Sequence, residues 1–352
     1  MFKILAINPG STSTKIGIFE DEKLIHEANI HHSAEELRKY TTVDEEIQFR
    51  HRVIVEALDK AGIDVKSLSA IGCRGGLVRP VPGGTYLVNE ALLHDSRYAK
   101  IKHPCNLAAL IGHSLGEAYG IKSYITDPPI TFEAEKVALV SGCYLIPRPQ
   151  TFHALNHKAI AKKHCRITGK KYEDVTLIVA HFGGGISIGV HHQGRVIDVT
   201  DALSEGPFTP ERAGNLPTVE FADLCFDGKY DRAQIQRLLR GDAGFQGYLG
   251  TTDMREIVKM IEAGDEKAKF YFDAFIYQVG KDIGAMATVK NGKIDAILLT
   301  GGIAHNQMFV DRVIEKVGWI APVFVYPGQE ELQALNLGVL AVLQGKETAK
   351  TY

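Results

Sequence analysis

The chain has 352 residues, of which 45% are hydrophobic and 23% charged. This size and composition fit two globular domains and exclude a disordered or fibrous protein. The 40 Lys and Arg residues nearly balance the 42 Asp and Glu residues, so the chain lacks the basic character of a dedicated nucleic-acid binder.

The five cysteines are widely spaced and form no C-x-x-C pair, which argues against a disulfide framework and a structural zinc site. No apolar run approaches the roughly 18 residues that a membrane-spanning helix needs. The first residues, MFKILAINPG, begin directly with a strand-like segment and lack the apolar core of a signal peptide. We therefore expect a cytoplasmic protein with no membrane or nucleic-acid partner.

Residues 4–19 predict a β-hairpin, because two apolar segments flank a turn of Gly, Ser and Thr. Small residues at its tip would let backbone N–H groups and hydroxyls converge on phosphate oxygens. The candidate phosphate ligands are Ser11 and Ser13, with Lys15 adding a positive charge. Asn8 offers a carbonyl oxygen to Mg²⁺ or to its water shell. A polar hairpin tip without a ligand is the alternative.

Four helices are predicted between the strands from capping residues and apolar stripes. In the first, Thr42 and Glu45 form a capping box; in the second, Asn106 is the expected N-cap. The alternation of helices with apolar strand segments is an α/β pattern. The helices are expected from Thr42 to Gly62, from Asn106 to Gly120, over residues 266–289, and over residues 332–343 before Gly345.

Glycine clusters follow three apolar, β-rich segments at residues 70–71, 177–180 and 296–299. A strand followed by a glycine-rich turn is where an α/β protein brings its backbone close to phosphates. Residues 177–199 also repeat the strand–turn–strand design of residues 4–19. The repetition predicts a duplicated domain, with two unrelated hairpins as the alternative.

Several common enzyme motifs are absent. The sequence contains no G-x-x-x-x-G-K-[ST] of a P-loop, no H-R-D or D-F-G of a protein kinase, no G-x-G-x-x-G of a dinucleotide-binding fold and no H-E-x-x-H of a zinc protease. Any phosphate chemistry in this chain must therefore run on tight hairpins.

The tip sequence N-P-G-S-T-S-T-K resembles the N-terminal signature of the acetate and butyrate kinase family, which has the actin-like, sugar-kinase-like ATPase fold. Further matches follow in order over essentially the whole chain, and the ordered set is far more specific than any one of them. These segments are Ile71–Gly76, Tyr124–Asp127, Phe152–His157, His181–Gly185, Pro210–Gly214, Asp253–Arg255, Gly301–Asn306 and Glu330–Leu332.

The resemblance implies an α/β protein of two duplicated actin-like ATPase (ribonuclease H-like) domains, each a mixed sheet flanked by helices. The N-terminal domain is expected to comprise residues 1–147 plus 333–352, because the C-terminal helix of the family returns to it. The C-terminal, nucleotide-binding domain would span residues 148–332. The family also implies a homo-oligomer with a dimer as its building block.

The implied activity is the reversible transfer of a phosphoryl group from ATP to a short-chain fatty acid, with Mg²⁺, to give ADP and an acyl phosphate. The hairpin tip and the R-G-G and P-E-R-A-G segments resemble the butyrate branch of the family, so butyrate is the first expected substrate. Isobutyrate or another branched acid is the second, followed by propionate and acetate. A sugar kinase or a non-metabolic ATPase of the same fold is the alternative from another class.

In such a reaction an anion approaches a polyanion, so cations must neutralise both. Arg74 and Arg212 are the predicted catalytic arginines, since a guanidinium group can bind carboxylate or phosphoryl oxygens bidentately. A carboxylate acceptor is already ionised and needs no general base. Asp127 is therefore expected to position a metal-bound water or an arginine, and His153 to donate a hydrogen bond to the phosphoryl group.

The resemblance completes the set of expected site residues, and it includes the hairpin-tip residues already chosen above. Asn8 and Glu330 are the expected magnesium residues. The nucleotide is expected to contact Asn8, Ser11, Ser13, Lys15, His181, Gly183, Gly184, Gly185, Asp253, Met254, Arg255, Gly301, Gly302, Ile303 and Asn306.

Gly75 and Gly76 follow Arg74, where acetate kinases carry a valine pair. One hypothesis is that the missing isopropyl groups make room for the tail of butyrate, each buried CH₂ contributing roughly 0.8 kcal/mol to binding. The alternative is that the two glycines allow a tight turn with positive φ.

Overall fold

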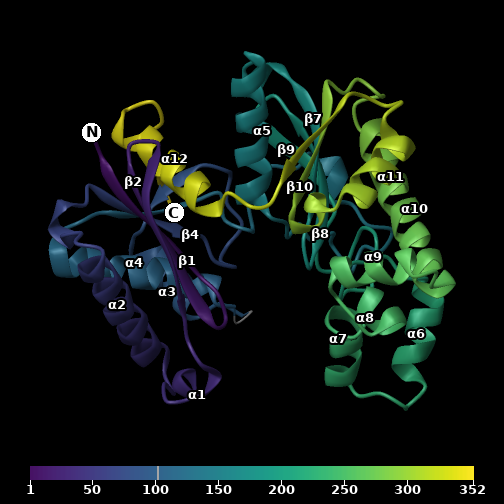
Figure 1. Ribbon diagram of the computed structural model, residues 1–352, viewed down its shortest axis with the longest axis horizontal. Helices are drawn as coiled ribbons and strands as arrows, with labels where there is room; N and C mark the ends of the chain where they lie inside the picture. The colour runs from purple at the N-terminus through teal and green to yellow at the C-terminus, as the bar shows by residue number, and fades with distance from the viewer. Residues whose placement is uncertain (101–102) are drawn as a thin grey trace. The chain divides into compact units, whose positions relative to one another are not determined.

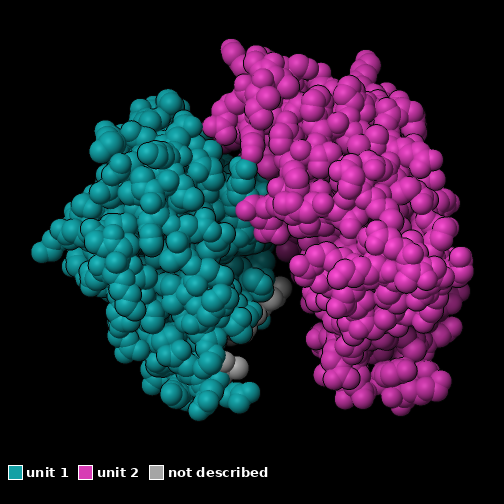
Figure 2. Space-filling model, in the orientation of Figure 1, with its two compact units in different colours: residues 1–132, 154–156, 330–352 teal, residues 133–153, 157–329 magenta. Residues whose placement is uncertain are grey.

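The structure is a computed structural model that describes residues 1–100 and 103–352. The chain divides into two compact units (Figure 2). The first comprises residues 1–132, 154–156 and 330–352, and the second comprises residues 133–153 and 157–329. Residues 133–147, which were expected in the N-terminal domain, thus lie in the second compact unit. The predicted bounds of the two folding domains stay a prediction.

A seven-stranded mixed sheet forms the centre of the first unit, in the order β12-β5-β6-β4-β1-β2-β3. Strands β1, β4 and β6 are parallel, and β2 and β3 continue the sheet as antiparallel strands. Because β1 and β4 are central, nearly all of their residues are buried. The strands are β1 (Lys3–Pro9), β2 (Ser13–Glu20), β3 (Lys23–His31), β4 (Ala70–Arg74), β5 (Thr85–Leu87), β6 (Ser123–Thr126) and β12 (Lys350–Thr351).

Helices cover both faces of this sheet (Figure 1). Alternate residues of β1 point to opposite faces, so Leu5 and Ile7 pack in the cluster that includes α2 and α4, whereas Ile4 packs against α12. The predicted return of the C-terminal helix to the first sheet is confirmed, because α12 contacts β1, β4 and β6. The helices of this unit are α1 (Ala34–Leu37), α2 (Val43–Lys60), α3 (Glu90–Arg97), α4 (Cys105–Tyr119) and α12 (Glu331–Leu343), with a 3₁₀ turn at Val65–Ser67.

The predicted capping box of α2 is confirmed. The Thr42 hydroxyl accepts a hydrogen bond from the Glu45 N–H, and the Glu45 carboxylate accepts one from the Thr42 N–H. The predicted apolar face is also correct, since Ile47, Ile54 and Leu58 are buried.

The predicted N-cap role of Asn106 is wrong. Helix α4 begins one residue earlier, at Cys105, so Asn106 lies within its first turn. Its Oδ1 accepts a hydrogen bond from the Leu77 N–H at 2.8 Å, a donor from a distant loop that only the tertiary structure supplies. Pro104 takes the N-cap position without a side-chain cap.

A five-stranded mixed sheet in the order β11-β10-β7-β8-β9 forms the centre of the second unit. Strands β7, β10 and β11 are parallel, and β8 and β9 are antiparallel extensions. Helix α5 packs against one face, where Ile160 and Leu177 belong to one hydrophobic cluster, and α10 and α11 pack against the other, where Phe275 and Ile178 belong to another. The strands are β7 (Thr176–Phe182), β8 (Ile186–His192), β9 (Arg195–Val199), β10 (Ala296–Gly301) and β11 (Val323–Pro327).

The long predicted helix is confirmed as α10, which ends where Asn291 and Gly292 adopt positive φ. The helices of the second unit are α5 (Ala154–Thr168), whose residues 154–156 belong to the first unit, α6 (Thr218–Phe226), α7 (Arg232–Arg240), α8 (Gly244–Leu249), α9 (Met254–Glu262), α10 (Glu266–Thr288) and α11 (Gln307–Val317), with 3₁₀ turns at Lys136–Leu139, Tyr172–Asp174 and Gly302–His305.

The two sheets share one design. The order β6-β4-β1-β2-β3 in the first unit matches β11-β10-β7-β8-β9 in the second, with the same pattern of parallel and antiparallel pairs. Each contains the hairpin that the sequence repetition predicted, β1–β2 and β7–β8. The prediction of a duplicated domain is therefore confirmed at the level of topology.

Among the described residues, no helix combines the length and apolar character needed to span a lipid bilayer.

Candidate functional site

The carboxyl end of the first sheet gathers three predicted site residues. Ile7 pairs with Cys73 and Arg74 with Thr126 along the parallel strands, so Asn8, Arg74 and Asp127 follow one another across the same edge. In open α/β sheets this edge is where ligands bind.

Glu331, the first residue of α12, joins this edge. Its carboxylate accepts a hydrogen bond from Asn8 Nδ2 and forms an ion pair with Arg74 Nη1. The Arg74 and Glu331 side chains are only 19% and 13% exposed, so water screens the pair less than it would on the surface. Sequence reasoning chose Glu330, which precedes the helix as its N-cap residue, and missed Glu331. The sequence did indicate an acidic site here, because Glu331 directly follows Glu330.

Asp127 has an unusual backbone. Its φ of 39° is left-handed for a non-glycine residue, a conformation found mainly where surrounding structure enforces it. Its Oδ1 accepts a hydrogen bond from the Gly84 N–H at 2.7 Å, and its own N–H donates to the Gly84 carbonyl at 3.0 Å. The side chain is buried, with 4% exposure, so the Gly84 turn fixes its position.

Arg50, on α2, binds the tip of the β1–β2 hairpin. Sequence reasoning missed this residue. All five guanidinium N–H groups are used: they donate to the carbonyls of Gly10 and Ser13, to the Thr14 hydroxyl and to the Glu46 carboxylate at 2.9–3.1 Å. The signal was an arginine on the otherwise apolar face of α2.

The predicted tip residues do not all point to one place. Lys15 lies on β2, where its ammonium group pairs with Glu27 at 2.9 Å and is 42% exposed. Ser11 lines a cavity of about 300 Å³ beside Arg50 and the start of α4. The backbone carbonyl of Ser13 accepts a hydrogen bond from the Gly10 N–H at 2.8 Å, which closes the hairpin tip.

In the second unit, His181 and Gly183–Gly185 form the tip of the β7–β8 hairpin. The Gly183 N–H donates to the Gly185 carbonyl at 3.0 Å, which closes the turn tightly. The His181 ring is buried and lies 4.4 Å from the His153 ring, measured between centroids. The structure therefore brings both predicted histidines together at the glycine-rich turn.

Arg212 reaches the same turn. Its Nη1 donates to the Ala202 carbonyl at 2.8 Å, and a Cβ atom at Gly185 would collide with its guanidinium group. Burial lowers the pKa of Arg212, yet an arginine starts high enough to stay protonated at neutral pH. Gly185 is needed so that the cation can lie directly against the hairpin.

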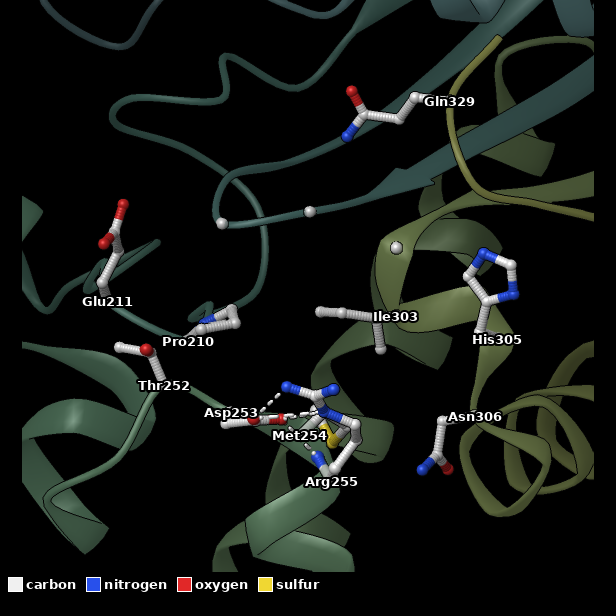
Figure 3. A pocket seen from close by; sticks show the side chains of 13 residues that line it. Pro210, Glu211, Thr252, Asp253, Met254, Arg255, Ile303, His305, Asn306 and Gln329 are labelled. Atoms are coloured by element: carbon white, nitrogen blue, oxygen red, sulfur yellow. Dashed lines mark hydrogen bonds and ion pairs between the residues drawn. The ribbon is translucent and has the colours of Figure 1, made fainter. Parts of the chain in front are cut away.

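A cavity of about 880 Å³ opens beside this hairpin, wholly within the second unit (Figure 3). Asp253 and Arg255 form a bidentate ion pair on its wall, which lowers the pKa of Asp253 to about 2. A Cβ at Gly302 would meet open space, so a flat ligand can lie on its backbone. The cavity is lined by the predicted Gly183, Gly184, Asp253, Met254, Arg255, Gly302, Ile303 and Asn306, and also by Pro210, Glu211, Thr252, His305 and Gln329, which were not predicted.

Gly301 was predicted to contact the nucleotide but does not line this cavity. Its φ is 94°, and a Cβ there would collide with the backbone of Phe182. The residue therefore lets β10 approach β7 closely, one position before the cavity wall begins.

Gly75 and Gly76 are enclosed. A Cβ at Gly75 would collide with Pro128, and one at Gly76 would lie 2.7 Å from Asn106 Oδ1. Pro128 and Asn106 of α4 fill the space that two side chains would take, so the structure contradicts the hypothesis that this space is open to an acyl tail. Neither Gly75 nor Gly76 has a positive φ, so the alternative hypothesis of a turn with positive φ is also wrong. Close packing requires glycine at both positions.

Two mixed sheets of one duplicated order define the actin-like ATPase fold, which confirms the predicted fold class. The acetate kinase of Porphyromonas gingivalis matches this structure with a TM-score of 0.82 over 97% of this chain and 100% of that chain. The two are 19% identical in sequence, so the likeness shows the fold.

The sequence comparisons are closer. Residues 141–321 match the model of the acetokinase family. The probable butyrate kinase of Clostridium botulinum (strain Eklund 17B / Type B) is 46% identical over 100% of this chain and 99% of its own length. Butyrate kinase 1 of Clostridium acetobutylicum is 46% identical over 100% of both chains. The chain belongs to the acetokinase family, and the predicted enzyme class, a phosphotransferase with a carboxyl acceptor, is confirmed.

Proposed function

We propose that this chain transfers the γ-phosphoryl group of ATP reversibly to a short-chain fatty acid, with butyrate as the preferred acid. The observation that carries the proposal is the 46% identity, over the full length of the chain, to relatives named butyrate kinase. The two groups of predicted site residues described above support it, because each lies at one edge of a duplicated sheet.

The cavity of the second unit is the proposed nucleotide site. Its volume of about 880 Å³ falls in the range of ordinary ligand pockets and is large enough for a nucleotide. Gly302 and Ile303 offer a surface for the base, while Gly183 and Gly184 line the cavity at the hairpin tip, where phosphates would lie. ATP and ADP are therefore assigned to this unit.

Arg74 and Arg212 are the proposed charge-neutralising residues. Arg74 is held in place by Glu331, and Arg212 by the Ala202 carbonyl, so neither needs to be ordered when substrate binds. Fixed cations of this kind stabilise charge as it spreads over the transferring group. His181 and His153 would donate hydrogen bonds to phosphoryl oxygens, and Asp127 would orient a water or an arginine.

The edge of the first sheet fits Mg²⁺, which prefers oxygen ligands and is commonly held by one or two carboxylates together with water and substrate phosphates. Asn8 meets Glu331 through Nδ2, so its Oδ1 is not part of that hydrogen bond. Asn8 Oδ1 and a carboxylate, Glu331 or the predicted Glu330, would hold the ion. Mg²⁺ bound there would neutralise charge on the phosphates of ATP.

The proposal is tested by trapping the acyl phosphate with hydroxylamine, using ATP, Mg²⁺ and a panel of unbranched and branched acids from two to six carbons. We expect the highest kcat/KM with butyrate. A maximum with isobutyrate, propionate or acetate would leave the reaction class intact and change the substrate. Phosphorylation of glucose-type acceptors without hydroxamate would identify a sugar kinase, and ATP hydrolysis without any acceptor would identify a non-metabolic ATPase.

A further inference from the structure

The last residues of the sequence lie beside the turn that fixes Asp127. Strand β12 adds to the edge of the first sheet in parallel with β5, pairing Lys350 with Tyr86 and Thr351 with Leu87. Strand β5 in turn pairs with β6, so that Thr85 lies opposite Thr126, the residue before Asp127. The segment 350–352 is therefore two strands away from a proposed catalytic residue.

Lys350 provides a direct connection. Its Nζ donates a hydrogen bond to the Gly83 carbonyl, and its side-chain carbons lie where a side chain of Gly84 would be, with Cε 3.0 Å from the position of a Cβ. Gly84 is the residue that exchanges two hydrogen bonds with Asp127. Lys350 thus contacts the same Gly83–Gly84 turn that binds Asp127 through its backbone.

Tyr352 anchors the segment at its far end. Its hydroxyl donates to Asp95 Oδ2 and accepts from the Arg79 N–H, both at 2.8 Å. The Arg79 guanidinium carbon lies 4.7 Å from the centre of the Tyr352 ring, a cation–π distance. Because Arg79 and Gly84 both lie in the loop between β4 and β5, the segment 350–352 is attached to that loop at both ends.

We propose that residues 350–352 are a positioning element of the active site, in which Lys350 holds the Gly83–Gly84 turn and thereby sets the side chain of Asp127. The inference rests on the proposed function, in which Asp127 takes part in phosphoryl transfer. Asp127 needs such support, because its left-handed backbone relaxes unless neighbouring contacts over-determine it.

The test is a double-mutant cycle between Lys350→Met and Asp127→Asn, with kcat, KM for both substrates and the unfolding temperature measured for each variant. Lys350→Met keeps the stem that packs on Gly84 and removes the hydrogen bond to Gly83. We expect kcat to fall about five- to tenfold, the rate equivalent of one lost hydrogen bond, with KM unchanged and the unfolding temperature lowered by no more than a few degrees. Lys350→Arg should restore most of the rate, and Lys346→Met, an exposed lysine on the same terminal segment, is the matched control.

In the Asp127→Asn background, Lys350→Met should have no further effect, since coupled residues are not additive. A wild-type kcat for Lys350→Met, an equal loss in both backgrounds, or a loss explained by a lower unfolding temperature would each overturn the inference while the enzyme still makes acyl phosphate. Failure of the wild-type chain to form hydroxamate would instead overturn the proposed function.

Discussion

At the scale of single residues, two adjacent glutamates face different neighbours. Glu331 contacts Asn8 and Arg74, whereas Glu330 occupies the N-cap position of α12 and makes no side-chain capping hydrogen bond there. A shift of one residue at a helix start turns a side chain by about 100°. This is why sequence reasoning could find the acidic pair but not decide between its members.

Glu331→Gln and Glu330→Gln distinguish them. We expect Glu331→Gln to lower kcat by about 10²- to 10³-fold, the usual effect of losing one electrostatic contact in an active site, and to raise the Mg²⁺ concentration needed for half-maximal rate. Glu330→Gln should change both values little. The reverse pattern would restore Glu330, the residue predicted from the sequence, as the magnesium ligand.

The glycines after Arg74 show a different limit of sequence reasoning. Their small size was noticed, but which atoms occupy the vacated space depends on Asn106 and Pro128, which belong to other segments. Arg50 was missed for the same reason, because its partners include the tip of a hairpin 36 or more residues away. Local signals such as the Thr42 capping box were predictable; contacts between distant segments were not.

At the scale of elements, β7, β8 and α5 enclose a row of polar side chains. The Tyr172 hydroxyl meets His191 Nδ1 at 2.7 Å, His191 Nε2 meets His157 Nδ1 at 3.3 Å, and His157 Nε2 meets Ser187 Oγ at 2.9 Å. Burial lowers the pKa of His157 well below its usual value and that of His191 to about 3, where the charge of Lys158 adds to the effect. Both rings are therefore neutral in the folded protein.

This row predicts a loss of stability in acid. An unfolded histidine binds a proton below about pH 6.5, whereas folded His191 does so only near pH 3, so the unfolded state gains protons first. The stabilisation is complete above pH 6.5 and falls as the pH drops from there towards 3, by about 2 kcal/mol for one such histidine at pH 5. Urea unfolding of the wild type and of His191→Gln between pH 7.5 and 5 measures it.

The His191→Gln variant should lose less stability between these pH values than the wild type, whatever its stability at pH 7.5. His94→Gln, a substitution at an exposed ring on α3, is the control and should follow the wild type. Parallel curves for all three proteins would show that His191 titrates normally in the fold.

At the scale of the whole molecule, the duplicated strand order gives each unit a corresponding hairpin, and the cavity of about 880 Å³ lies in the second unit. The family resemblance predicts that the C-terminal domain binds the nucleotide. The described residues of the second unit form a cavity that suits this role. The predicted homo-oligomer and the cytoplasmic location stay predictions.

Hydrogen–deuterium exchange with ADP and Mg²⁺ tests this division. We expect slower exchange in Gly183–Gly184, in Asp253–Arg255 and in Gly302–Asn306, since bound nucleotide would cover the cavity that these segments line. Residues of the β2–β3 strand pair serve as the internal reference and should be unchanged. Protection confined to the first unit would place the nucleotide elsewhere.

The buried guanidinium of Arg50 has a consequence for the energetics of recognition. A flexible loop must be ordered when its ligand binds, and that ordering weakens affinity by about 0.5–1.5 kcal/mol for each immobilised side chain. Here the hairpin tip is already fastened to α2 through the carbonyls of Gly10 and Ser13. The tip is thus preorganised, and a phosphate that meets it loses little affinity to conformational entropy.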